Sequence, residues 1–201
     1  MNLHLVLSAV SLACYLGAIG FLVALHFQRS GYSIVGHAVS DYGVGPTRRM
    51  FAAYISLGSA GGLVFMGALL TRATAVPGWL LGVLAVMVAA RFGLTIFPTD
   101  LEGTKLTRTG YLHYLFAILG FAASYTVIRN LTPMFAGEEA WAPVRGVLSS
   151  LSVLATAALV GVCATMWRPL RRVFGLVERV FLLTALVWFA VASAGMVVFG
   201  G

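Results

Sequence analysis

The chain has 201 residues, of which 60% are hydrophobic and only 9% are charged. This composition excludes an ordinary soluble domain, in which about a quarter of the residues are charged. The net charge of +7 could indicate a nucleic-acid partner, but the placement of Lys and Arg described below fits attraction to anionic lipid head groups instead. Membrane lipids are therefore the expected partners, and nucleic acid is not.

Six apolar runs are each long enough to cross a hydrocarbon core of about 30 Å, which takes about 20 residues of helix. Strands of a membrane barrel would alternate in shorter segments, so helices are favoured. The sequence predicts an all-α fold, a polytopic transmembrane bundle of six helices that forms a single domain over residues 1–201. The runs lie at about Leu5–Leu25, Phe51–Leu70, Trp79–Phe97, Tyr111–Ile128, Val144–Met166 and Leu176–Phe199.

The first run lacks a preceding Lys or Arg and is longer than the apolar part of a signal peptide, so we interpret it as a retained helix. Alternate connections carry eight Lys or Arg against three on the opposite side. The positive-inside rule then predicts a multi-pass protein of the cytoplasmic membrane with both termini outside. The eight are Arg29, Arg48, Arg49, Lys105, Arg108, Arg168, Arg171 and Arg172, and the three are Arg72, Arg129 and Arg145.

The connection between the first two runs mixes apolar residues with His37, Ser40 and Asp41 and contains several glycines and a proline. It is too apolar for a free linker. We expect it to lie in the membrane interface or to fold back against the bundle.

Gly58 and Gly62 form a G-x-x-x-G pair in the second run. Small residues at this spacing let two helices approach closely in lipid. We expect a packing role for them rather than the lining of a pore.

Arg91 lies within the third run, roughly 10 Å from its inner end at 1.5 Å per residue. A cation at that depth costs about 2.5–3.5 kcal/mol unless it is paired or extends to the interface. The sequence predicts a carboxylate partner on the same side, from Asp41, Asp100 or Glu178. The alternative is an arginine that reaches the interface by itself.

A polar bridge, residues 97–113, joins the third and fourth runs. A proline ends the third helix, and Thr107 or Thr109 can cap the fourth, so His113 falls in or near its first turn. The positive end of a helix favours a neutral imidazole that can act as a base or a ligand. The structural alternative is a His113 that only hydrogen-bonds Asp100.

Glu178 and Arg179 lie in the first turns of the sixth run, after a basic connection. A glutamate near a helix N-terminus is stabilised by the helix dipole, which is its structural explanation. Arg179 can bind a phosphate or pair with Asp41 or Asp100.

Three motifs together resemble the domain of unknown function 998 family, six-helix prokaryotic integral membrane proteins. They are Ser40–Gly43, Phe97–Asp100 followed by Gly110–His113, and Gly175–Arg179, and the resemblance spans nearly the whole chain. It implies the six-helix fold and a shared polar cluster, without a reaction to transfer, and His37 is not part of it. The Ser-Asp-x-Gly element also resembles, more loosely, a first-loop motif of a eukaryotic six-helix family implicated in lipid remodelling, which favours lipids.

Three classes of function follow. The first is a membrane-embedded enzyme, such as a hydrolase, acting on a lipid or another amphiphile at the cytoplasmic edge. The second is a small-solute or proton-coupled carrier. The polar groups gather at one edge of the membrane rather than at its midplane, and this argues against a carrier. The third is a structural or accessory protein whose polar cluster ties loops together. The sequence leaves the oligomeric state open.

For the enzyme, carboxylate and imidazole ligands would suit zinc with an open position for water. Metal-free acid–base chemistry by Asp100 and His113 fits the sequence equally well. An enzyme with zinc and an enzyme without a cofactor are therefore alternatives. The candidate catalytic residues and zinc ligands are Asp41, Asp100 and His113, with His37 as a possible fourth ligand. The candidate substrate-binding residues are Ser40, Arg91, Glu178 and Arg179.

Overall fold

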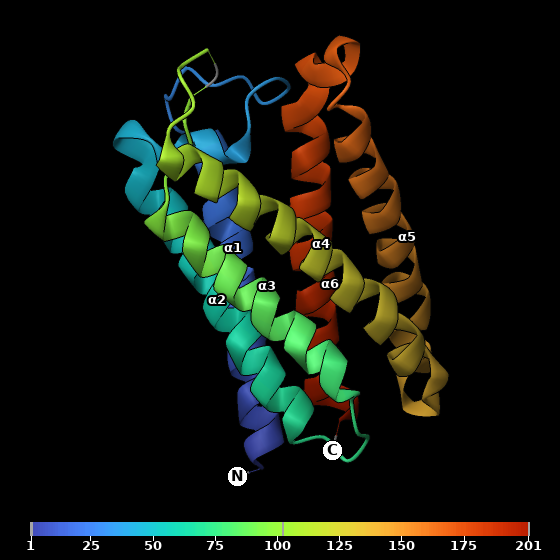
Figure 1. Ribbon diagram of the computed structural model, residues 1–201. Coiled ribbons are helices and arrows are strands. Elements are labelled where there is room, and N and C mark those ends of the chain that lie inside the picture. Colours follow the sequence, from blue (N-terminus) through green and yellow to red (C-terminus); the bar gives the residue numbers. More distant parts are fainter. Residues whose placement is uncertain (1, 102, 201) are drawn as a thin grey trace.

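The computed structural model describes residues 2–101 and 103–200, and within them it contains helices and no strands (Figure 1). Each of six long helices is long and apolar enough to cross a membrane. The predicted all-α, six-helix membrane fold is confirmed. The helices are α1 (Leu3–His26), α2 (Arg48–Leu70), α3 (Gly78–Ile96), α4 (Arg108–Gly137), α5 (Ala142–Ala164) and α6 (Phe174–Phe199).

Both termini lie at the lower end of the bundle in Figure 1, and the first, third and fifth connections lie together at the upper end. We call this upper end the polar end and define it by residues 27–47, 97–107 and 165–173. Short 3-10 helices form part of it: η1 (Val39–Gly43), η2 (Gly45–Thr47) and η4 (Arg168–Val173). A fourth such helix, η3 (Glu139–Trp141), lies between α4 and α5.

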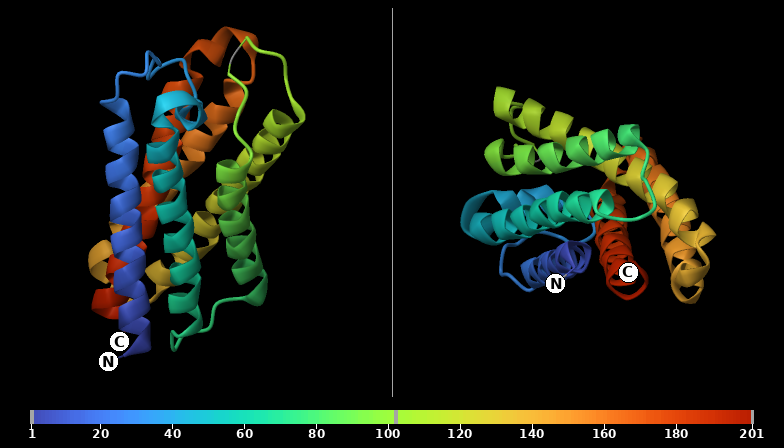
Figure 2. Two further views of the ribbon diagram at one scale, coloured as in Figure 1. Left: turned by 90° about the vertical axis from the view of Figure 1, so that its left-hand side faces the viewer. Right: turned by 90° about the horizontal axis from the view of Figure 1, so that it is seen from below.

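Helix α6 is the most buried of the membrane spans. Seen from below, it lies between α1 and α5, and α2 and α3 complete the bundle (Figure 2). Helix α4 crosses the others obliquely, from α3 at the polar end to α5 at the opposite end (Figure 1). Its oblique path separates the beginning of α4 from the beginning of α6 at the polar end.

Helix α4 extends to Gly137, so the predicted end near Ile128 is wrong. Pro133 lies inside the helix without ending it. Leu131 and Phe135 are fully buried there, and the Phe135 ring stacks on that of Trp141 with centroids 4.2 Å apart. Tertiary packing of this apolar face outweighs the hydrogen bond that proline removes.

An ion pair closes the end of the bundle near the termini. Arg72 Nη2 lies 2.6 Å from Glu138 Oε2, and the arginine side chain is only 4% exposed. The guanidinium also lies over the rings of Phe135 and Trp141, 5.0 and 5.6 Å from their centroids. The ion pair therefore joins the second connection, which contains Arg72, to the fourth connection, which contains Glu138.

Candidate functional site at the polar end

The first connection folds back onto the beginning of α6. The Leu176 N–H donates to the Val35 carbonyl at 3.0 Å. The Val39 N–H donates to Oε2 of the buried Glu178 at 2.6 Å. The sequence predicts that this connection lies in the membrane interface or folds back against the bundle, and in the structure it folds back against the bundle.

Arg179 fixes the same connection from inside the bundle. Its Nη1 donates to the carbonyl oxygens of His37 and Gly175, at 2.7 and 2.8 Å. Its Nε donates to Nε2 of His26 at 2.7 Å, and the guanidinium lies over the Tyr42 ring, 5.8 Å from its centroid. Most of the donors on Arg179 are thus used to join α1, the first connection and α6.

Asp41 lies buried in η1. Its charge acts on Glu178, so two of the predicted site carboxylates are neighbours. Burial, with a further contribution from Asp41, raises the pKa of the Tyr32 hydroxyl in the same connection. Tyr32 therefore stays neutral at physiological pH.

Asp100 caps the beginning of α4. Its Oδ2 accepts a hydrogen bond of 2.6 Å from the Thr107 N–H, and the Thr107 hydroxyl donates to Oδ1 at 3.0 Å. The same hydroxyl accepts from the Gly110 N–H at 3.1 Å, as an N-cap does. A Cβ on Gly110 would collide with Asp100 Oδ2. The carboxylate thus lies on the first turn, where the helix dipole stabilises its charge.

His113 joins α4 to the end of α3. Its side chain is buried, and Nδ1 lies 2.8 Å from the Phe97 carbonyl oxygen. Because a carbonyl oxygen only accepts, Nδ1 carries a hydrogen, and in a neutral ring Nε2 is then the basic nitrogen. The structural alternative of a hydrogen bond from His113 to Asp100 is wrong; the partner of the ring is the backbone of Phe97.

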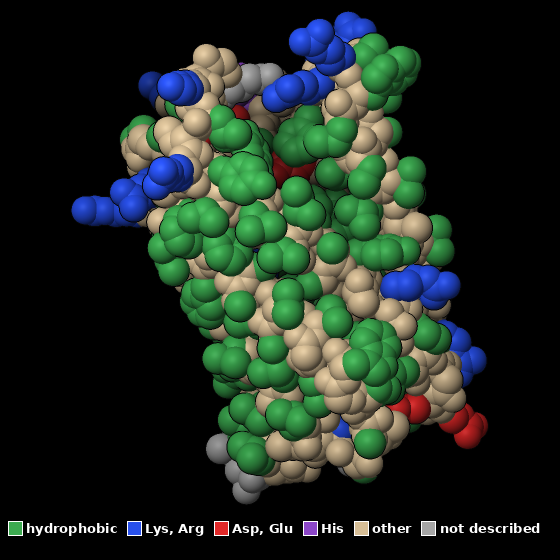
Figure 3. Space-filling model, in the orientation of Figure 1, with side chains coloured by type: hydrophobic (Ala, Val, Ile, Leu, Met, Phe, Trp, Pro, Cys, Tyr) green, Lys and Arg blue, Asp and Glu red, His purple; other side chains and the backbone are tan. Residues whose placement is uncertain are grey.

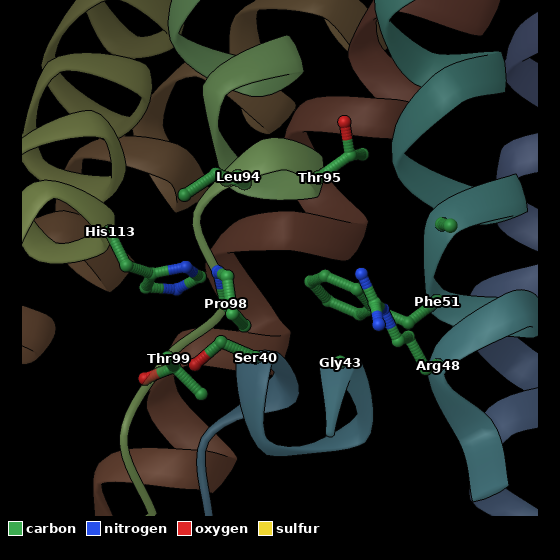
Figure 4. Close-up of a pocket in the computed structure, with 10 residues that line it drawn as sticks. Ser40, Gly43, Arg48, Phe51, Leu94, Thr95, Pro98, Thr99 and His113 are labelled. Carbon is green, nitrogen blue, oxygen red and sulfur yellow. The ribbon is translucent and has the colours of Figure 1, made fainter. Parts of the chain in front are cut away.

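His113 and Ser40 meet at a small pocket between η1, α2, the end of α3 and α4 (Figure 4). Its volume of about 20 Å³ is enough for one water-sized group. In the close-up, His113, Ser40 and Thr99 lie on one side and Phe51 and Arg48 on the other. The lining is part polar and part apolar.

The surface near the pocket is hollowed at the polar end. The space-filling view shows acidic side chains at the floor of this hollow and Lys and Arg side chains around its rim (Figure 3). The hollow opens toward the side of the bundle, which in a membrane-spanning protein faces lipid.

The predicted zinc ligands are not brought together. Among residues 2–101 and 103–200, no three His, Cys, Asp or Glu side chains are grouped so that they could hold a metal ion. Asp100 caps α4, His113 Nδ1 is bonded to Phe97, and His37 Nδ1 accepts from the Ser33 N–H at 3.0 Å. The set of Asp41, Asp100 and His113, with His37, therefore does not fit a zinc site.

A family model described as a protein of unknown function, DUF998, matches residues 8–195. The chain belongs to the DUF998 family. No curated protein and no solved structure matches it.

The motif segments of this DUF998 chain contact one another at the polar end. Phe97–Asp100 meets Gly110–His113 through the Asp100 cap and the His113 hydrogen bond. Gly175–Arg179 holds the first connection, which includes the motif Ser40–Gly43, and a Cβ on Gly175 would collide with the His37 carbonyl. Two motif glycines thus mark close approaches that leave no room for a side chain.

Arg91 does not have the carboxylate partner that the sequence predicts. The described residues of this DUF998 protein show an ion pair of Arg72 with Glu138 but none that includes Arg91. The predicted partner Asp100 bonds Thr107, and Glu178 bonds the Val39 N–H. Arg91 is nevertheless buried between the helices.

Several polar residues of the site carry little signal in the sequence. His26 accepts from Arg179, Thr99 and Arg48 line the pocket, and the Tyr54 ring lies beneath the Arg91 guanidinium at 5.7 Å. Each is a single polar or aromatic residue within or beside an apolar run, and such residues are more often part of the packing. Only the contacts between helices in this DUF998 chain identify them.

Proposed function

We propose that this protein binds the polar head of a lipid or another amphiphile at the polar end of its bundle, on the cytoplasmic side of the cell membrane. The observation that carries the proposal is the pocket in which His113 and Ser40 meet. The pocket lies where the transmembrane helices end. Head groups lie at this level in a bilayer that these helices span.

The surroundings of the pocket favour an amphiphile over a soluble solute. Ile96 precedes the bridge and Leu106 lies within it, and they are 66% and 52% exposed; Tyr111 near the beginning of α4 is 64% exposed. Exposed apolar and tyrosine side chains at a helix end suit the membrane interface. A ligand that enters here passes from lipid to a polar site without crossing bulk water.

Hydrolysis of that amphiphile is a second candidate. The pocket has room for one water molecule, and the basic nitrogen of a neutral His113 is the Nε2 that does not bond Phe97. His113 would take a proton from this water as the water oxygen attacks an ester carbonyl, and would give that proton to the departing alcohol oxygen as the acyl C–O bond breaks, so that a fatty acid and an alcohol are released. Ser40 and Thr99 can offer hydroxyl donors beside it.

The test is lipid mass spectrometry on protein purified in mild detergent. We expect His113→Gln and Ser40→Ala to retain several-fold less lipid per chain than the unsubstituted protein. His37→Gln is the matched control, because its ring lies in the same region but outside this pocket. Equal lipid retention in all four proteins would contradict the proposal.

The same proteins separate binding from hydrolysis. They are incubated with vesicles made from an extract of the host membrane lipids, and released fatty acid is measured. Release that His113→Gln abolishes and His37→Gln preserves would support hydrolysis. Retained lipid without release would leave binding as the function.

A further inference from the structure

Arg91 is a buried cation whose charge no described residue neutralises. It is 9% exposed, and no described carboxylate forms a salt bridge with it. An unpaired charge inside a membrane-spanning bundle is strongly disfavoured. A group that compensates this charge must therefore come from outside the described chain.

The unused donors of Arg91 have the geometry of an oxyanion site. Nε and Nη2 are buried and have no hydrogen-bond partner among the described residues. These two nitrogens share one edge of the guanidinium, so their N–H groups point in the same direction. Such a fork matches two oxygens of a phosphate or carboxylate.

Two tyrosine hydroxyls add to this site. Tyr15 and Tyr54 are each 1% exposed, and neither hydroxyl has a hydrogen-bond partner in the described structure. Both lie within range of the Arg91 charge, and the Tyr54 ring lies beside the guanidinium. Three buried side chains with polar atoms to spare thus lie close together.

Gly58 makes room for the guanidinium. A Cβ on Gly58 would collide with Nη2 of Arg91. Gly62, one turn further along α2, approaches Val88 and Met87 most closely: an added Cβ would lie 2.9 Å from Cγ2 of Val88, 3.0 Å from Cε of Met87 and 3.5 Å from the Tyr15 hydroxyl. The packing role predicted for the pair applies to Gly62, whereas Gly58 accommodates a charged side chain.

The site lies one helical turn below the pocket of His113 and Ser40. Leu94 and Thr95 of α3 line that pocket, and Arg91 is one turn deeper on the same helix. Phe51 of α2 also lines it, and Tyr54 is one turn deeper, with the two rings 5.9 Å apart. The pocket and the Arg91 site are thus neighbours along α2 and α3.

We propose that Arg91, Tyr15 and Tyr54 form a binding site for a phosphate group inside the bundle. The phosphate is either free inorganic phosphate or part of a lipid head group. The site stands whether or not the pocket above it binds an amphiphile, because its donors lie outside that pocket.

The test is a titration of delipidated protein in detergent, at constant ionic strength, with sodium phosphate and separately with short-chain phosphatidic acid. Thermal unfolding and calorimetry report binding. We expect at least one compound to raise the unfolding midpoint, and Arg91→Gln and Arg91→Lys to weaken its binding at least tenfold. The exposed Arg145→Gln is the control and retains full affinity.

The two compounds identify the source of the phosphate. A response to inorganic phosphate indicates a free anion, and a response to phosphatidic acid alone indicates a head group. No response to either compound, or an equal response in Arg91→Gln, would overturn the proposal.

Two further comparisons decide the matter if the Arg91 variants do not fold. Tyr54→Phe removes only a hydroxyl and should bind severalfold more weakly; unchanged affinity would overturn the proposal. Gly58→Ala and Gly67→Ala both add a methyl group to α2, but Gly58→Ala displaces the guanidinium, whereas Gly67→Ala meets only the Leu7 side chain. Affinity should fall in Gly58→Ala and persist in Gly67→Ala, and the same loss in both would count against the site.

Discussion

The Asp100 carboxylate accepts a 2.6 Å hydrogen bond from the backbone N–H of Thr107, the N-cap residue of α4. A residue that the sequence marks as a catalytic candidate thus also holds the beginning of a transmembrane helix. Any loss of activity on its substitution has to be separated from a loss of stability.

We expect Asp100→Ala to lower the free energy of unfolding by about 1–2 kcal/mol, because loss of a capping interaction typically costs this much. Thermal unfolding in detergent measures the change. Lys105→Ala, an exposed substitution in the same bridge, is the control and should stay within about 0.5 kcal/mol of the unsubstituted protein. An unchanged midpoint for Asp100→Ala would mean that the cap is dispensable.

Glycine substitutions at two positions should act in opposite directions. A Cβ on Gly175 would collide with the His37 carbonyl, whereas one on Gly146 in α5 meets nothing within 4 Å. Gly175→Ala should cost about 1–3 kcal/mol through overpacking. Gly146→Ala should gain up to about 1 kcal/mol from helix propensity. Unfolding midpoints of the two variants test this, and a stabilising Gly175→Ala would contradict the close contact.

The helices were predictable because each needs only an uninterrupted apolar run of the right length. The end of α4 was not, since the burial of Leu131 and Phe135 against Trp141 carries the helix through Pro133. Such packing depends on a residue outside the helix. A local pattern therefore places the helices in the membrane but does not fix every boundary.

The candidate site was predictable as a region and not as a set of contacts. The sequence brings Asp41, Glu178 and Arg179 to one end, and the structure agrees. Charge alone suggested a carboxylate for Arg91, but Glu178 bonds a backbone N–H instead. Helix rotation and loop path decide such choices, and neither is contained in the spacing of residues.

Loss of the Glu178 carboxylate should release the first connection locally. The Val39 N–H is buried with Glu178 Oε2 as its acceptor, and an unsatisfied buried donor costs about 1–3 kcal/mol. We expect Glu178→Ala to speed hydrogen exchange across residues 33–43 about tenfold or more, measured by mass spectrometry. The exposed Glu139→Ala should leave this peptide unchanged. Equal protection in both variants would mean that other contacts hold the connection.

Orientation in the membrane can be tested with single cysteines in a background where Cys14 and Cys163 are replaced by serine. Lys105 lies in the bridge at the polar end, and Thr74 lies in the exposed connection between α2 and α3 at the opposite end. The excess of basic residues at the polar end predicts that this end faces the cytoplasm. An impermeant maleimide should therefore label Thr74→Cys in intact cells and Lys105→Cys only after the cells are opened. The reverse pattern would place the polar end outside, and the proposed amphiphile would then have to come from the outer leaflet.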